Sequence, residues 1–238
     1  TLVATITDDS QPIDQGLIWR VYRDQKGLDE KSRVVGTFRE AAPVLRLEPG
    51  NYMIHAAFGR AHLMRKVKIA AGRSVPEKFV LNAGGLRVNA SLISGEPAPE
   101  HTVHLDIYAD ERDQFGQRTK VMAGAKPGLV IRLNAGLYHI VSTYGDANAT
   151  VRSDVIVEAG KLTEVSASHG GAKVTFKLVT EQGGNAIPDT QWSLANTQGE
   201  VIKESVGAVP SHILAAGNYS VTARHSGKSF RREFSVKA

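Results

Sequence analysis

One short segment, with the pattern Leu-x-x-Gly-x-Tyr, occurs three times along the chain. Its three copies begin at Leu47, Leu133 and Leu214 and end at Tyr52, Tyr138 and Tyr219. After each tyrosine, apolar residues recur at every second position, which is the period of a β-strand with one buried face. The chain is therefore predicted to repeat one β-structural unit.

Glycine turns separate each of these strands from a second alternating stretch. The turns contain Gly59, Gly145 and Gly227. Two alternating stretches around a short glycine loop predict a β-hairpin. Upstream of each tyrosine, an apolar-x-apolar stretch opens with Trp19, Leu105 or Trp192 and predicts a further strand, whereas no long stretch has a helical period.

These repeated elements predict an all-β chain of three tandem Greek-key β-sandwich modules, immunoglobulin-like or transthyretin-like, with about seven strands each. Gly84-Gly85 and Gly170-Gly171 mark the boundaries between module 1 (residues 1–84), module 2 (85–170) and module 3 (171–238). We expect these glycine pairs to act as short hinges that leave neighbouring modules close and partly free to reorient. Module 3 lacks the glycine that follows the second hairpin strand elsewhere, so we expect it to be truncated at its C-terminal end.

The tyrosines of the repeated segment are predicted to be structural. In a tyrosine corner, a tyrosine near a strand start turns its hydroxyl back to the backbone of the preceding connection. The glycine two residues earlier permits the tight backbone that this arrangement needs. We therefore interpret Tyr52, Tyr138 and Tyr219 as tyrosine corners.

At this segment the chain resembles bacterial immunoglobulin-like and transthyretin-like repeats, including the carboxypeptidase-regulatory-like, collagen-adhesin B-type and PEGA-type modules. The resemblance covers all three copies. It implies a location outside the cytoplasm, in the bacterial periplasm or at the cell surface, and a role as a spacer, adhesion part or accessory domain.

Composition excludes several kinds of chemistry. The chain has 238 residues, 42% of them hydrophobic and 22% charged, which is ordinary for a globular protein. It has no cysteine, which excludes disulfides, cysteine-ligated zinc and thiol catalysis. No apolar run approaches the roughly 18 residues that a membrane-spanning helix needs.

No catalytic or metal-binding motif is evident. The sequence lacks G-x-S-x-G, P-loop, G-x-G-x-x-G and H-E-x-x-H patterns. His101 and His104 are three apart and would point to opposite faces of a strand. The run Asp110–Asp113 has two alternative interpretations, a calcium-binding turn and an acidic hairpin tip. Arg112 within the run favours the hairpin tip. We expect no enzyme activity, cofactor or metal.

Basic residues concentrate on two of the three hairpins. Lysine and arginine total 29 against 24 acidic residues, for a net charge of +5. The candidate residues for an anionic ligand, such as an acidic polysaccharide, are Arg60, Arg65, Lys66, Arg224, Arg231 and Arg232. The alternative is a solvated strand face whose charges discourage edge pairing. Nucleic acid is not expected, because aromatic residues are not interleaved with the charge.

The leading hypothesis is a non-enzymatic spacer or protein-interaction scaffold of the bacterial cell envelope, with other envelope proteins or neighbouring domains as partners. One alternative is binding of an anionic envelope polymer through the basic hairpins of modules 1 and 3. Another is an accessory region of a larger envelope enzyme or of a protein with a von Willebrand-type domain.

Overall fold

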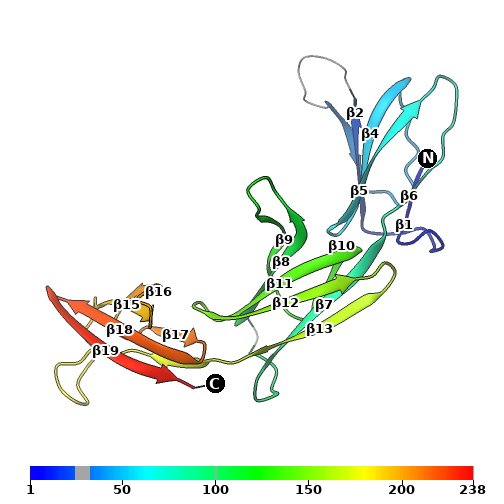
Figure 1. Ribbon diagram of the computed structural model, residues 1–238. Helices are drawn as coiled ribbons and strands as arrows, with labels where there is room; N and C mark the ends of the chain where they lie inside the picture. The colour runs from blue at the N-terminus through cyan, green and yellow to red at the C-terminus, as the bar shows by residue number, and fades with distance from the viewer. Residues whose placement is uncertain (25–32, 100, 238) are drawn as a thin grey trace.

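A computed structural model describes residues 1–24, 33–99 and 101–237, and every regular element in that part of the chain is a β-strand (Figure 1). The all-β prediction is therefore confirmed. Among the same residues, no helix is long and apolar enough to cross a membrane.

The described residues of the range predicted as module 1 form a four-stranded antiparallel sheet with the order β3-β2-β4-β5 and a parallel pair, β1-β6. The strands of this range are β1 (Leu2–Thr5), β2 (Leu17–Arg23), β3 (Arg33–Phe38), β4 (Gly50–Phe58), β5 (Ala61–Ile69) and β6 (Glu77–Val80). The hairpin predicted from the tyrosine segment is formed by β4 and β5.

Module 2 repeats this plan with the sheet β12-β11-β8-β9 and a three-stranded sheet, β10-β7-β13. Its strands are β7 (Ala83–Leu92), β8 (Val103–Arg112), β9 (Arg118–Ala125), β10 (Val130–Asn134), β11 (Gly136–Tyr144), β12 (Ala149–Val157) and β13 (Leu162–His169). Strand β7 pairs antiparallel with β10 and parallel with β13.

Module 3 has the sheet β16-β15-β18-β19 and the antiparallel pair β14-β17 among its described residues. Its strands are β14 (Ala172–Thr175), β15 (Gln191–Asn196), β16 (Val201–Val206), β17 (Ser211–Leu214), β18 (Gly217–His225) and β19 (Lys228–Val236). The same connectivity of the four-stranded sheet thus occurs three times along the chain.

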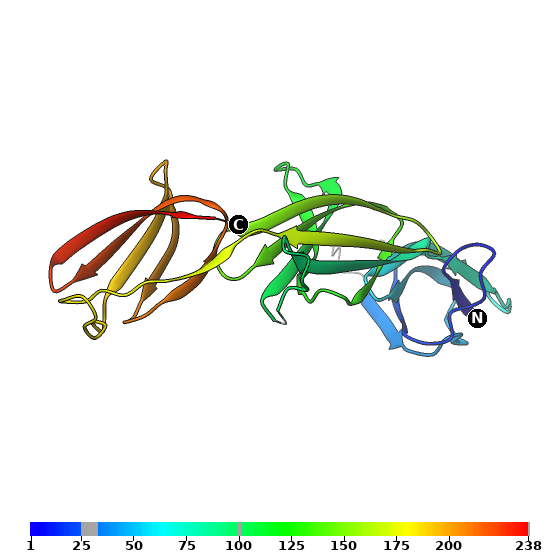
Figure 2. The same cartoon turned by 90° about the horizontal axis from the view of Figure 1, so that it is seen from below.

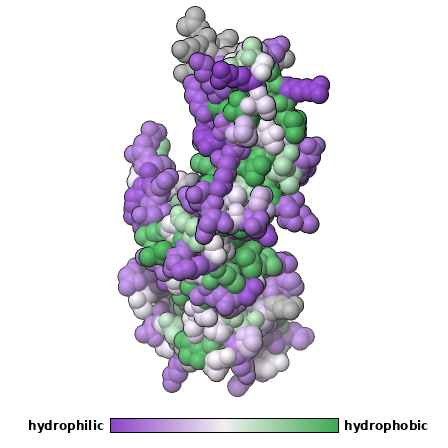
Figure 3. All heavy atoms as spheres, turned by 90° about the vertical axis from the view of Figure 1, so that its right-hand side faces the viewer, coloured by the Kyte–Doolittle hydropathy of each residue, from purple (hydrophilic) through white to green (hydrophobic). Residues whose placement is uncertain are grey.

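Buried side chains of the described residues gather in three clusters, one within each predicted module. Strands β2, β8 and β15 each place one large apolar residue in these clusters, with 0%, 1% and 7% exposure at Trp19, Leu105 and Trp192. Trp19 meets Phe79 edge to face at a centroid distance of 5.3 Å. The chain extends as a row of these units (Figure 2), and on the face in Figure 3 hydrophilic residues separate the hydrophobic ones.

The three repeated tyrosines make the same hydrogen bond. Each hydroxyl donates to the backbone carbonyl four residues earlier, at 2.8 Å for Tyr52 to Glu48, 2.9 Å for Tyr138 to Asn134 and 2.8 Å for Tyr219 to Ala215. Each of the three tyrosines is buried, with at most 8% of its surface exposed. The hydroxyl therefore closes the connection that leads into the strand, while the ring fills the core.

The glycine pair at positions 84 and 85 differs from the expected hinge. Both glycines lie inside β7, where a Cβ added to Gly84 would come within 2.2 Å of the Glu158 carbonyl oxygen. Glycine here allows two backbone segments of module 2 to approach closely. Only Leu81 and Asn82 separate β6 from β7, and only Gly170 and Gly171 separate β13 from β14.

Replacing Tyr138 by phenylalanine should lower the free energy of unfolding by about 1 kcal/mol, because the partly buried Asn134 carbonyl loses its donor. Tyr219→Phe should cost more, since the Tyr219 hydroxyl also accepts a hydrogen bond from Asn148 at 3.0 Å. Urea titrations of the two variants measure both losses. Equal losses would contradict a role for the second hydrogen bond.

Candidate functional site

The three basic residues predicted on the first hairpin do not form one charged face. Arg65 lies on the inner side of β5, with its guanidinium 4.3 Å from the ring centroid of Phe79, and forms an ion pair with Glu77. Lys66 points to the opposite side and pairs with Asp24. Arg60 is exposed in the turn. Arg65 and Lys66 therefore lie on opposite faces of the strand, because consecutive side chains alternate. The carboxylates of Glu77 and Asp24 partly neutralise their charge.

The second hairpin keeps more of its charge exposed. Arg224, Arg231 and Arg232 are all exposed. Ladder pairing places Arg224 opposite Ser229 and Thr222 opposite Arg231, so Arg224 and Arg231 are diagonal neighbours on one face. Arg232 is on the other face, beside Val221. Two of the three predicted residues on this hairpin therefore share a surface.

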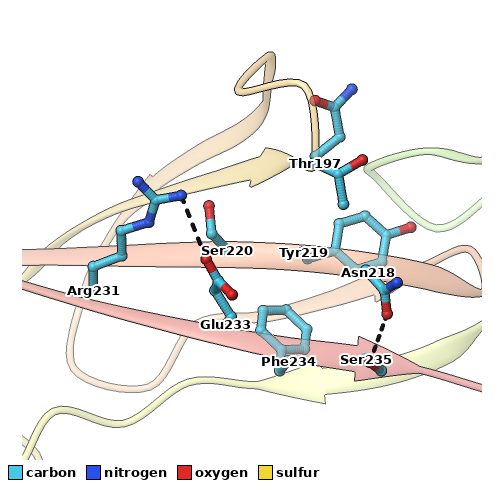
Figure 4. A pocket seen from close by; sticks show the side chains of 9 residues that line it. Thr197, Asn218, Tyr219, Ser220, Arg231, Glu233, Phe234 and Ser235 are labelled. Atoms are coloured by element: carbon cyan, nitrogen blue, oxygen red, sulfur yellow. Dashed lines mark hydrogen bonds and ion pairs between the residues drawn. The ribbon is translucent and has the colours of Figure 1, made fainter.

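Arg231 borders a shallow hollow of about 410 Å³ on the outer face of the β15-β18-β19 sheet (Figure 4). The other polar side chains around it come from Asn196, Thr197, Asn218, Ser220, Glu233 and Ser235. Arg231 faces Glu233 at 3.9 Å, and Ser235 donates to Asn218 at 2.6 Å. The hollow therefore offers both signs of charge.

The two basic hairpins belong to the modules on either side of module 2 (Figures 1 and 2). The equivalent hairpin of module 2 carries acidic side chains instead. His139 lies between Asp110 and Asp154, at 2.8 and 2.6 Å, and these hydrogen bonds raise its pKa. The six predicted basic residues are therefore not brought together into one site.

The acidic run of module 2 is occupied by local contacts. Asp113 accepts hydrogen bonds from the backbone N–H groups of Phe115 and Gln117, at 2.9 and 2.8 Å. In the described part of the chain, no group of three or more histidine, aspartate or glutamate side chains is arranged to bind a metal ion. The hydrogen bonds of Asp113 favour the acidic hairpin tip over the calcium turn.

Sequence reasoning missed the contacts between modules. The turn of the β4-β5 hairpin packs on β10, where a Cβ added to Gly59 would lie 3.0 Å from the Cβ of Arg132. The Arg60 N–H donates to the Arg132 carbonyl at 3.0 Å, and the Arg132 guanidinium lies 4.4 Å from the ring centroid of Phe58. Asn134 fixes this junction by accepting from the His62 N–H and donating to the His62 carbonyl, both at 3.1 Å.

The second junction, between modules 2 and 3, is also formed by a hairpin turn and the strand that precedes the next repeat tyrosine. A Cβ added to Gly145, in the turn between β11 and β12, would lie 2.5 Å from the Cβ of Ile213 on β17. Ile213 immediately precedes its repeat leucine, as Arg132 does. Asn148 accepts from the Ala215 N–H at 3.1 Å and donates to the Tyr219 hydroxyl. Both junctions therefore seat a hairpin turn on the strand that precedes the next tyrosine.

A chain of polar groups extends from this second junction. Asp146 meets His212 Nδ1 at 3.0 Å and Lys203 Nζ at 3.0 Å, and His212 Nε2 meets Ser205 Oγ at 3.1 Å. Burial raises the pKa of Asp146, but the hydrogen bonds from Lys203 and His212 outweigh burial, so the pKa is lowered overall.

The order Ser205, His212, Asp146 has the connectivity of a serine hydrolase triad. Ser205, however, lies within the extended strand β16, without the sharp turn that exposes a nucleophilic serine beside backbone N–H donors. The arrangement suits an ion pair that fastens module 2 to module 3.

Comparison with known proteins finds that one part of the chain is similar to a described family. Residues 173–238 match the family model of the Rhizobiales growth-associated tandem repeat domain. No curated protein matches the chain. The β-sandwich repeat fold agrees with the expected architecture, and the finer resemblance to transthyretin-like or PEGA-type modules stays a prediction.

Three solved structures are among those that match this chain, each with a TM-score below 0.5. The TIE protein of Bacillus anthracis is 14% identical over 99% of this chain, with a TM-score of 0.29, and this chain covers 47% of its length. The minor pilin GBS52 of Streptococcus agalactiae is 14% identical over 71% of this chain and 93% of its own, with a TM-score of 0.34. A streptococcal ancillary pilin is 10% identical over 100% and 94%, with a TM-score of 0.33.

The turn glycines provide a test of the junction. Gly145→Ala should destabilise the protein by about 2–4 kcal/mol, because it adds a collision with Ile213 to the cost of a left-handed residue at a φ of +78°. Gly116→Ala is the matched control, since Gly116 has a φ of +75° and no atom within 4 Å of an added Cβ. Chemical denaturation of both variants should show the larger loss at Gly145, and equal losses would rule out tight seating of this turn.

Proposed function

We propose that this chain is a non-enzymatic spacer and interaction scaffold of the bacterial cell envelope, outside the cytoplasm, built from three β-sandwich modules at residues 1–84, 85–170 and 171–238. The observation that carries the proposal is the recurrence of one junction. In both places a hairpin turn seats on the next module, and the connecting segment has two residues.

Such junctions suit a spacer because they restrict bending. A two-residue connection limits the separation of neighbouring modules, and the side-chain amides of Asn134 and Asn148 fix their rotation through hydrogen bonds across the boundary. The tyrosine corners at Tyr52, Tyr138 and Tyr219 would brace the receiving strand from inside each module. A partner held at one end is then kept at a set distance from a partner at the other.

The match of residues 173–238 to a tandem repeat domain supports the repeat organisation. The envelope location rests on the resemblance of the Leu-x-x-Gly-x-Tyr segment to bacterial extracytoplasmic repeats. An accessory role beside a catalytic or von Willebrand-type domain is compatible with the same spacing function.

Spin labels on cysteines introduced at Ile156 and Val206, which are 65% and 70% exposed, measure the rigidity of the second junction. The native chain has no cysteine to interfere. We expect a narrow distance distribution that widens in the double variant Asp146→Ala/Asn148→Ala, because both side chains bind across the boundary. Asp113→Ala, which alters a hairpin tip without a junction, is the control. A broad distribution in the unmodified background would refute the spacer.

Anionic polymer binding is a second candidate, favoured by the exposed arginines Arg224, Arg231 and Arg232 of module 3. Polygalacturonate is a suitable probe. The double variant Arg224→Glu/Arg231→Glu should weaken salt-sensitive binding by about tenfold or more, because it reverses two charges on one face. Lys66→Glu, at a lysine already paired with Asp24, should change it less. Unchanged binding in the double variant would end this proposal.

A further inference from the structure

Two histidines lie next to each other on the outer face of the β4-β5 hairpin. His55 is on β4 and His62 is on β5, and their ring centroids are 5.5 Å apart, with an angle of 50° between the ring planes. Their chain neighbours Ile54 and Ala61 are buried, so alternation places both histidines on the solvent side of the sheet. His62 is exposed and His55 is half-buried, so a ligand can reach this pair of rings.

A thioether lies beside the two imidazoles. Met64 is directly opposite His55 in the β4-β5 ladder, and Ala57 is opposite His62. Directly opposite side chains have Cβ atoms about 4.5–5.5 Å apart, and diagonal ones remain within reach of long side chains. Met64 is 51% exposed, and Met53 lies on the same face, two residues before His55. Two of the three methionines of the chain therefore lie beside this histidine pair.

The repeated fold does not require these side chains. Neither equivalent ladder pair in the other two modules contains a histidine or a methionine. Counted from the repeat tyrosine, these equivalent pairs are Val141–Arg152 and Thr222–Arg231. The same sheet therefore forms without an imidazole or a thioether at these positions, and its stability does not explain why module 1 has them.

Hydrogen bonding and charge leave both imidazoles suited to bind a metal ion. Nδ1 of His62 lies 3.1 Å from the Arg60 carbonyl oxygen, which can only accept, so Nδ1 carries the proton and Nε2 keeps a lone pair. Donation to a carbonyl is the usual support of a metal-binding histidine. Burial, followed by the charges of His62 and Arg20, lowers the pKa of His55, which favours the neutral ring that binds metals.

The separation of the rings fits two ligands of one ion. Metal–imidazole bonds are about 2.0 Å long, so two rings that share an ion at roughly 110–120° have centroids about 5.1–5.5 Å apart. We propose that His55, His62 and Met64 bind one monovalent copper ion on the outer face of the β4-β5 hairpin. Two imidazoles and a thioether form a three-coordinate set, and its soft sulfur donor selects Cu(I).

The charge around this set also favours a monovalent ion. Arg20 lies opposite His55 in the ladder between β2 and β4. In the part of the chain that the structure describes, no carboxylate forms an ion pair with Arg20, His55 or His62. Repulsion by Arg20 would be twice as large for a divalent ion. Hard divalent ions also require oxygen ligands, which these side chains do not supply.

The proposed copper site lies next to the first junction but is separate from it. The backbone N–H and carbonyl of His62 bind Asn134 of module 2, whereas the His62 ring belongs to the proposed site. The junction contacts form without a metal ion. Copper binding is therefore an activity beyond the spacer function, and neither depends on the other.

The experiment titrates the chain into the coloured complex of Cu(I) with ferrozine, under anaerobic conditions with ascorbate. The chain should remove one equivalent of Cu(I), and the loss of absorbance measures its affinity. His55→Ala and His62→Ala should each weaken binding by about 100-fold or more, because loss of a direct ligand costs more than the roughly 10–100-fold lost with its supporting partner. Met64→Leu, which keeps the size of the side chain, should weaken binding by about tenfold or more.

The matched controls are His104→Ala and Met122→Leu, which remove the same two side-chain types from module 2. Both controls should keep the affinity of the unmodified chain. X-ray absorption at the copper edge should show two nitrogen ligands and one sulfur ligand, and the sulfur should be lost in Met64→Leu. Circular dichroism establishes that each variant is folded.

Failure of the folded chain to remove Cu(I) from ferrozine would overturn the proposal. Equal affinities of the His55→Ala and His104→Ala chains would do the same, as would a copper spectrum without sulfur. Each of these results would leave the spacer intact, because the spin-label distances are measured without copper.

Discussion

At each junction, a glycine in a hairpin turn packs against the strand that precedes the repeat tyrosine of the next module. This contact determines the arrangement of the whole chain. Gly59 brings the backbone of one module against Arg132, and Gly145 does the same at Ile213. A larger residue would have to displace a packed strand, which resists small changes in volume. The carbonyl that accepts the tyrosine hydroxyl is at the end of the receiving strand, at Asn134 in β10 and at Ala215 directly after β17. Packing inside a module and docking between modules therefore depend on neighbouring residues.

Much of the fold follows from local patterns. Alternation after Tyr52, Tyr138 and Tyr219 predicts the hairpins β4-β5, β11-β12 and β18-β19, because one face of each must be buried. The same alternation also determines to which face of a strand each charged side chain points. Arg65 and Lys66 are adjacent on a strand and must point to opposite faces, so they could not act on one ligand surface.

The junctions could not be predicted in the same way. Asn148 meets Ala215, and Asp146 meets His212, across 67 and 66 residues. Nothing local marks these residues as partners, because an exposed turn and a buried contact both favour a glycine followed by polar residues. The glycines at 84 and 85 show the opposite case. Their sequence is that of a hinge, but close approach of Glu158 to β7 is the physical reason for them.

The parallel pairing of β7 with β13 has a mechanical consequence. The chain enters module 2 at the beginning of β7 and leaves it at the end of β13, and the two strands share eight residue pairs in register. A pull on the ends of the molecule would slide one strand along the other and load all of those hydrogen bonds together, rather than opening them one after another. Module 1 has the same geometry in β1 and β6 with only four pairs. Under tension, the middle of the chain would therefore outlast its N-terminal module.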